Sequence, residues 1–149
     1  MKKVLIQNKK AGFNYEILEK FEAGVQLFGF EVKSLKGAHG SLDGAYVTIR
    51  DNEIFLVNAN IPPYQALNTP ESYAPRRDRK LLLNKKEIGR LVGFVAQKGL
   101  TMVPLSVYNN GRKLKVEIAV ARGKKKYDKR ESIKARDDKR KIERTLKYQ

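Results

Sequence analysis

Apolar and polar residues alternate along much of the chain, which predicts a protein built mainly from short β-strands. The clearest alternation lies in residues 113–120, where every second residue from Leu114 to Val120 is apolar and Lys113, Lys115 and Glu117 are charged. Similar patterns predict strands at residues 15–18, 21–28, 46–50, 54–57 and 101–108. Turn-forming residues at 51–53 and 109–111 should join neighbouring strands into hairpins. Five or six such strands favour a small closed or nearly closed antiparallel barrel.

Four segments interrupt this pattern. Gly24 lies inside a predicted strand, which indicates a bulge or a sharp bend. Pro104 cannot donate a ladder hydrogen bond, so its strand should lie at an edge or contain a bulge. Residues 1–10 form a short basic lead-in, and the proline-rich residues 61–75 should form an exposed loop.

Two helices are expected, one long and one short. The long one covers residues 85–98, because Asn84 can cap it, Glu87 completes a capping box, and Gly99 follows its end. Its apolar stripe consists of Ile88, Leu91, Val92 and Val95. The short helix covers residues 30–35 and stops at Gly37.

The last 28 residues have a different composition from the rest. In residues 122–149, 13 Lys and Arg stand against 5 Asp and Glu, a net charge of +8 within the +16 of the whole chain. We expect a folded domain at 1–121 and a basic tail at 122–149 that is disordered alone and helical once a polyanion neutralises it. A tail that only aids solubility is the alternative; Tyr127, inside a lysine cluster, favours nucleic acid, because its ring can stack on a base.

Overall composition narrows the class of protein. A net charge of +16 and a sequence pI near 10.1 indicate a polyanionic partner, usually RNA or DNA. The chain has no cysteine and no apolar run long enough for a membrane span or a signal peptide. We therefore expect a cytoplasmic protein. An anionic membrane surface is a less favoured partner than nucleic acid, because the tail lacks the wide apolar face that an interfacial helix needs.

Catalytic or metal-binding chemistry is not expected. His39 is the only histidine, and it lies in a glycine-rich loop. The carboxylate pairs Asp137–Asp138 and Asp51–Glu53 fit solvated surface better than a Mg²⁺ site. The glycines do not have the spacing of a phosphate-binding or dinucleotide-binding loop, so we predict a protein that is not an enzyme and needs no cofactor.

Candidate RNA-binding residues outside the tail form basic clusters, with Lys9 and Lys10 near the N-terminus and Arg76, Arg77, Arg79 and Lys80 before the Leu81–Leu83 run. The leucines are expected mainly in the core, with one of them possible at the surface. From its position alone, Glu22 fits a salt bridge better than a contact with a base amino group.

Several motifs occur in an order that is typical of one family. They are FEAG at 21–24, EVKSL at 31–35, RKLLL at 79–83, and GKK at 123–125 followed by DKR at 128–130. With them the chain resembles the small protein B family, the SsrA-binding proteins that partner transfer-messenger RNA (tmRNA) in bacterial ribosome rescue. The resemblance extends over nearly the whole chain.

This resemblance implies an oligonucleotide-binding (OB) barrel, acting as a monomer, that binds the tRNA-like domain of tmRNA. It also implies a tail that enters the empty mRNA channel of a stalled 70S ribosome near the 16S rRNA decoding centre. Alanyl-tRNA synthetase and elongation factor Tu would be indirect partners through alanyl-tmRNA. The outcome would be trans-translation, in which the nascent peptide is tagged for degradation.

The family also implies roles for individual residues. Its tmRNA contacts fall on positions matching Asn8, Lys9, Glu22 and Leu82. To these the basic clusters add Lys10, Arg79 and Lys80 as residues expected to bind tmRNA. Those expected at the ribosome are Lys124, Lys125, Tyr127, Asp128, Lys129, Arg130, Ile142 and Leu146. Two other hypotheses are a generic basic barrel bound to ribosomal RNA and an RNA-processing enzyme with a carboxylate metal site.

Overall fold

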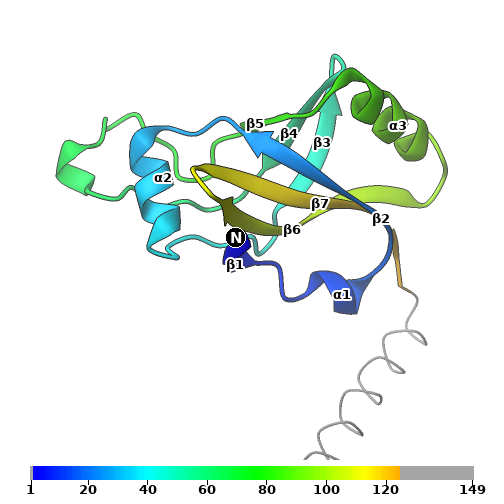
Figure 1. The fold of residues 1–149 in the computed structure, drawn as a ribbon, viewed down its shortest axis with the longest axis horizontal. Helices are drawn as coiled ribbons and strands as arrows, with labels where there is room; N and C mark the ends of the chain where they lie inside the picture. Colours follow the sequence, from blue (N-terminus) through cyan, green and yellow to red (C-terminus); the bar gives the residue numbers. More distant parts are fainter. Residues whose placement is uncertain (1, 125–149) are drawn as a thin grey trace, which may run out of the picture.

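The computed structural model describes residues 2–124, which fold around one antiparallel sheet (Figure 1). No helix in this part of the chain is long and apolar enough to cross a membrane. The strands are β1 (Lys2–Gln7), β2 (Tyr15–Val25), β3 (Tyr46–Arg50), β4 (Glu53–Val57), β5 (Arg79–Leu82), β6 (Leu100–Asn110) and β7 (Lys113–Gly123). The helices are α1 (Ala11–Asn14), α2 (Gly29–Lys36) and α3 (Lys85–Val95), with a 3₁₀ turn, η1, at Ala66–Asn68.

The sheet has the strand order β1-β6-β7-β2-β5-β4-β3, and every pair is antiparallel. Strand β3, at one end of this order, also comes close to β6. The sheet therefore curls, as an OB barrel does, and encloses a core to which Leu35 of α2 and Leu91 of α3 contribute. This confirms the predicted mainly β fold with few helices.

The alternation in β7 positions the core as predicted. Leu114, Val116, Ile118 and Val120 are all buried. Lys113 on the opposite face is exposed. Strand β7 is an interior strand of the barrel wall, hydrogen-bonded to β6 on one side and to β2 on the other.

Of the two irregularities predicted within strands, at Pro104 and at Gly24, only the one at Pro104 is a bulge. The register of β6 shifts between Pro104 and Ser106, so the proline lies at a bulge; the strand is not at an edge, because β1 covers it. Gly24 is not bulged: the register shift in β2 lies between Ile17 and Glu19. A Cβ at Gly24 would lie 3.3 Å from the Cβ of Leu82, so glycine permits the close approach of β5.

Helix α3 begins as predicted and ends earlier. The Asn84 side chain accepts from the Glu87 amide at 2.8 Å, and Glu87 accepts from the Asn84 amide at 3.2 Å. The helix ends at Val95 instead of Lys98. Leu91 is fully buried, whereas Val92 is more than a third exposed, so the buried stripe is narrower than predicted.

Three elements were not predicted: β1, the short helix α1 and β5. Strand β1 replaces the expected basic lead-in. The boundary predicted after Ala121 falls inside β7, which runs to Gly123. The predicted tail beyond Lys124 lies outside the described residues.

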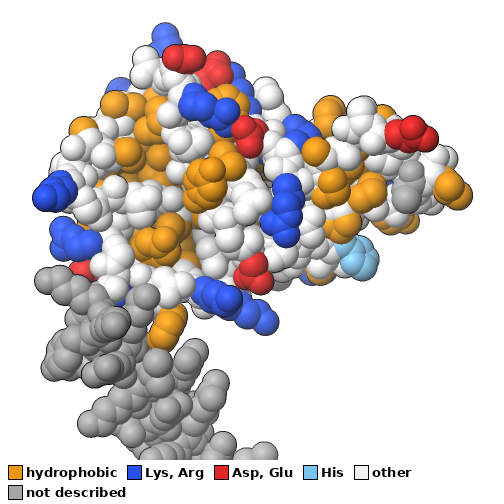
Figure 2. Space-filling model, turned by 180° about the vertical axis from the view of Figure 1, so that it is seen from behind, with side chains coloured by type: hydrophobic (Ala, Val, Ile, Leu, Met, Phe, Trp, Pro, Cys, Tyr) orange, Lys and Arg blue, Asp and Glu red, His pale blue; other side chains and the backbone are white. Residues whose placement is uncertain are grey.

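Helix α2 and residues 58–78 form a lobe that projects from the sheet (Figure 1). Within it, the Phe30 and Tyr73 rings meet edge to face, with centroids 4.7 Å apart. Hydrophobic side chains gather on the lobe in the rear view of Figure 2. The exposed loop predicted at 61–75 is therefore partly packed.

Candidate nucleic-acid interface

Arg79 is fully buried, which overturns its prediction as a surface contact for RNA. Its guanidinium donates to Glu31 through Nε at 3.0 Å and Nη2 at 2.6 Å. Further bonds go to the Ala59 carbonyl (2.6 Å), the Pro75 carbonyl (2.9 Å) and the Tyr73 hydroxyl (3.0 Å). These partners occupy the guanidinium, so Arg79 joins the lobe to the sheet.

Glu31 is the centre of this network. Besides Arg79, it accepts from Arg77 and from the Tyr73 hydroxyl at 2.9 Å. Burial acts to raise the pKa of Glu31, but the hydrogen bonds from Arg77, the Phe28 amide and Arg79 outweigh it, so the pKa lies below its usual value. Burial and the Glu31 carboxylate raise the pKa of Tyr73 to about 12. The cluster therefore holds an ionised carboxylate and a neutral phenol.

A second group of candidate residues lies on one surface of β2 and β5. We call this surface the outer β2–β5 face; it is formed by Glu22, Gly24, Lys80 and Leu82. Leu82 is 47% exposed while Leu81 is buried, so one leucine of the run does lie at the surface. Leu82 pairs with Gly24, two residues after Glu22. Lys80 forms an ion pair with Glu53 at 3.2 Å. This face presents an apolar side chain beside an exposed carboxylate.

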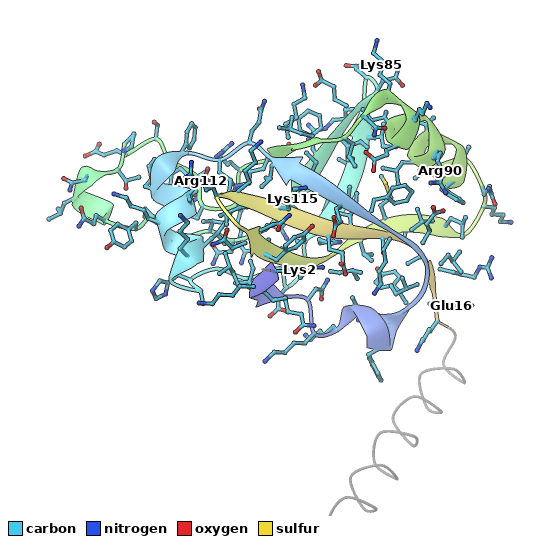
Figure 3. All side chains as sticks on the ribbon, viewed as in Figure 1. Lys2, Glu16, Lys85, Arg90, Arg112 and Lys115 are labelled. Atoms are coloured by element: carbon cyan, nitrogen blue, oxygen red, sulfur yellow. The ribbon has the colours of Figure 1, made fainter. Side chains whose placement is uncertain are left out.

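Glu22 lies directly opposite Glu117 of β7, a pairing that repulsion would disfavour. Lys2 of β1 offsets it: its Nζ is 3.0 Å from Glu117 and 3.8 Å from Glu22. The predicted salt bridge of Glu22 therefore exists, but it is long, and the Glu22 side chain remains 54% exposed. Figure 3 shows Lys2 and Lys115 in front of the sheet.

Tyr108 lies beneath these carboxylates. Its ring is buried, and the Lys2 Nζ lies 4.3 Å from the ring centroid. Burial, together with Glu22 and Glu117, raises the pKa of Tyr108. Lys2 and Tyr108 were not singled out in the sequence, because neither belongs to a motif and only the strand register brings them to Glu22.

Asn8, Lys9 and Lys10 lie elsewhere, at the end of β1. The Asn8 side chain donates to the Pro104 carbonyl at 2.9 Å, which fixes it against the bulge of β6. Lys9 and Lys10 are exposed. Strands β6 and β7 separate this group from the outer β2–β5 face. The structure thus places the predicted residues in two groups on one domain and brings neither into direct contact with the other.

Lys124 is the only predicted ribosome contact within the described residues. Its amide donates to the Asn14 carbonyl at 2.9 Å and its Nζ to the Gly12 carbonyl at 3.0 Å, which ties the end of β7 to α1. The others lie outside the described residues: Lys125, Tyr127, Asp128, Lys129, Arg130, Ile142 and Leu146. Across residues 2–124, no group of three or more His, Cys, Asp or Glu side chains could hold a metal ion.

Comparisons with known proteins agree with this fold. The chain matches the family model described as SmpB protein over residues 5–148. The SsrA-binding protein of Trichormus variabilis (strain ATCC 29413 / PCC 7937) is 50% identical over 145 residues, covering 97% of this chain and 94% of the relative. That of Thermosipho africanus (strain TCF52B) is 51% identical over 146 residues, covering 97% of each chain.

A solved structure leads to the same family. One chain of the structure described as "tmRNA-SmpB: a journey to the center of the bacterial ribosome" is 44% identical, with a TM-score of 0.67. The match covers 85% of this chain and 92% of that chain. Family model, relatives and fold agree over nearly the whole length, so the chain belongs to the SmpB family of SsrA-binding proteins.

Proposed function

We propose that this protein binds tmRNA and acts with it on the 70S ribosome in trans-translation. The observation that carries the proposal is the nearly full-length match to SmpB in a structure described by tmRNA, SmpB and the ribosome. The net charge of +16 fits an RNA partner. The family is one of RNA-binding proteins, and we assign the chain no catalytic step.

In this proposal the described domain binds the tRNA-like domain of tmRNA through two surfaces. The end of β1 supplies two exposed ammonium groups, Lys9 and Lys10, for phosphates. The outer β2–β5 face supplies the exposed Glu22 carboxylate, which can accept from a base, and Leu82, which can pack on a base or ribose. Arg79 supports this face from below.

The tail would act on the ribosome. Lys124, Lys125, Tyr127, Asp128, Lys129 and Arg130 would lie at the decoding centre, with Ile142 and Leu146 against the wall of the mRNA channel. Alanyl-tRNA synthetase and elongation factor Tu would be partners only through alanyl-tmRNA. This work would take place in the cytoplasm, where the ribosomes are.

A gel-shift titration at one fixed salt concentration tests the proposal, because affinity for RNA depends strongly on salt. It compares the tRNA-like domain of tmRNA with an ordinary tRNA. We expect a preference of about 4 kcal/mol or more, roughly a thousandfold, the low end of specific over non-specific binding. Equal affinity for the two RNAs would contradict the proposal and leave a generic basic barrel.

A further inference from the structure

A pocket of about 270 Å³ opens beside Asn8 and Lys10. Three segments of the chain meet there: the end of β1, the junction of α1 with β2, and the turn before β3. Its size is near the lower end of the roughly 300–1,000 Å³ of small-ligand pockets, so it can hold one base or a similar group. The side chains that give it chemical character are Asn8, Lys10, Asn14, Tyr15, Asp43 and Tyr46.

These side chains are the groups that recognise a nucleotide. Tyr46 lines the pocket and is 51% exposed, so its ring is accessible to a base. The Asn8 side chain is fixed through its Nδ2, and its Oδ1 has no hydrogen bond within residues 2–124. Lys10 is exposed at the rim, where an ammonium can hold a phosphate.

Asp43 indicates that a base, and not only phosphate, faces this pocket. Its carboxylate is exposed and forms no ion pair within the described part of the chain. Its amide donates to the Ser41 hydroxyl at 3.1 Å, which helps shape the turn. An unpaired carboxylate repels phosphate, but it accepts well from the N–H groups on a base edge.

We propose that this pocket binds a single unpaired nucleotide of the RNA partner. Tyr46 stacks on the base, Asp43 accepts from its N–H edge, and Lys10 holds the adjoining phosphate. The inference rests on the proposed function and adds a site to it, because Asp43 and Tyr46 belong to neither predicted RNA-binding group. It is a local subsite, distinct from the outer β2–β5 face.

The other aromatic pocket is less suited to a nucleotide. It lies on the lobe among Phe28, Phe30, Tyr73 and Arg77, and its lining is mostly apolar. Its one cation, Arg77, already donates to Glu31 and covers the Phe28 ring at 4.2 Å.

The chain contains no tryptophan, so Tyr46→Trp would place a single indole fluorophore at the pocket. The full-length variant is titrated with the tRNA-like domain of tmRNA, with binding followed in parallel by gel shift. Stacking should quench the emission of the introduced indole as RNA binds. Tyr64→Trp is the matched control, because Tyr64 is similarly exposed at 53% and lies on the lobe outside the pocket. The emission of this control variant should change little.

Affinities supply a second readout. Tyr46→Ala should weaken binding about 5- to 150-fold, the loss expected for one base–aromatic stack, whereas Tyr46→Phe should bind nearly as the unmodified chain does. Lys10→Met should reduce the salt slope of binding by about one, and Asp43→Asn should weaken binding without changing that slope.

Three results would overturn the proposal. If RNA binds without selective quenching at position 46 and Tyr46→Ala loses no affinity for it, the pocket holds no nucleotide. The proposed function would still stand in that case. Tighter binding by Asp43→Asn would mean that Asp43 only repels phosphate. Equal binding of tmRNA and ordinary tRNA would remove the proposed function and this site together.

Discussion

Glu31 and Arg79 are the residues whose roles depend most on tertiary structure. They lie 48 positions apart, yet both side chains are fully buried and joined by two hydrogen bonds. A buried charge is tolerated only when paired and hydrogen-bonded. The pair therefore fixes α2 and the lobe on strand β5, next to the exposed Leu82.

Glu31→Gln should lower the free energy of unfolding by about 3–5 kcal/mol at pH 7, because Arg77 and Arg79 lose their counterion. The folded-state pKa of Glu31 is depressed, so its stabilising contribution is complete above its ordinary value of 4.5 and is lost as pH falls below it. The difference between the two proteins should therefore shrink in acid. Urea unfolding across pH measures it.

The control for this experiment is Glu71→Gln, on an exposed residue of the same lobe with no ion pair among the described residues. It should leave stability nearly unchanged. The difference in the free energy of unfolding between Glu31→Gln and the unmodified protein should not stay constant down to about pH 3, which is below the ordinary carboxyl range. A constant difference would contradict the role assigned to the Glu31 carboxylate.

At Glu22 the decisive neighbour is Lys2. Lys2→Met should weaken tmRNA binding up to about fivefold more than Lys3→Met, because it removes the one cation that pairs with both Glu22 and Glu117 and leaves only Lys20, 3.9 Å from Glu117. Lys3 is the matched control, since it is exposed on the same strand and carries the same charge. Adding Glu117→Gln should remove the difference. Equal losses in the two lysine variants would show that Lys2 contributes only net charge.

At the scale of elements, the sequence predicts best where one local signal dominates. Helix α3 has a capping box and the hairpin β3–β4 has clear alternation, and both form where predicted, although α3 ends at Val95 instead of Lys98. Strand β1 was missed because Lys2 and Lys3 were interpreted as part of a basic segment, although charged residues are common on edge strands. Its pairing with β6 is a long-range contact that no local pattern encodes.

Burial alternates along strand β5, although residues 79 and 80 were interpreted only as a basic cluster. Arg79 and Leu81 are buried, whereas Lys80 and Leu82 face outward to differing extents. Had this short basic segment been treated as a strand, the buried Leu81 would have implied an inward Arg79 and an exposed Leu82. The grouping of Arg79 with its basic neighbours hid that alternation, and its partner Glu31 lies too far along the chain to be inferred.

The α3 capping box is open to direct measurement. Asn84→Ala should lower the free energy of unfolding by about 1 kcal/mol, because the Glu87 amide loses its acceptor. Asn84→Asp keeps an acceptor and should retain most of the stability. Urea denaturation compares the three proteins. Equal losses in both variants would mean that the side-chain cap does not stabilise the helix.

In the whole molecule, we expect the folded domain and the basic tail to have separate tasks. The domain carries both candidate RNA surfaces and the pocket proposed to bind a nucleotide, and Lys124 ties its last strand to α1. Residues 122–149 carry +8 of the net charge of +16. Charge attracts RNA without selecting it, so selectivity should come from the domain.

The most direct test removes residues 125–149 and measures two quantities on the same protein: affinity for the tRNA-like domain of tmRNA at fixed salt, and tagging of peptides on stalled ribosomes. The cut preserves β7 and the contacts of Lys124, and a thermal melt checks that the domain is folded. We predict that the preference for tmRNA over tRNA persists while tagging is lost. Loss of that preference in a folded domain, or tagging that continues without the tail, would contradict the division of labour.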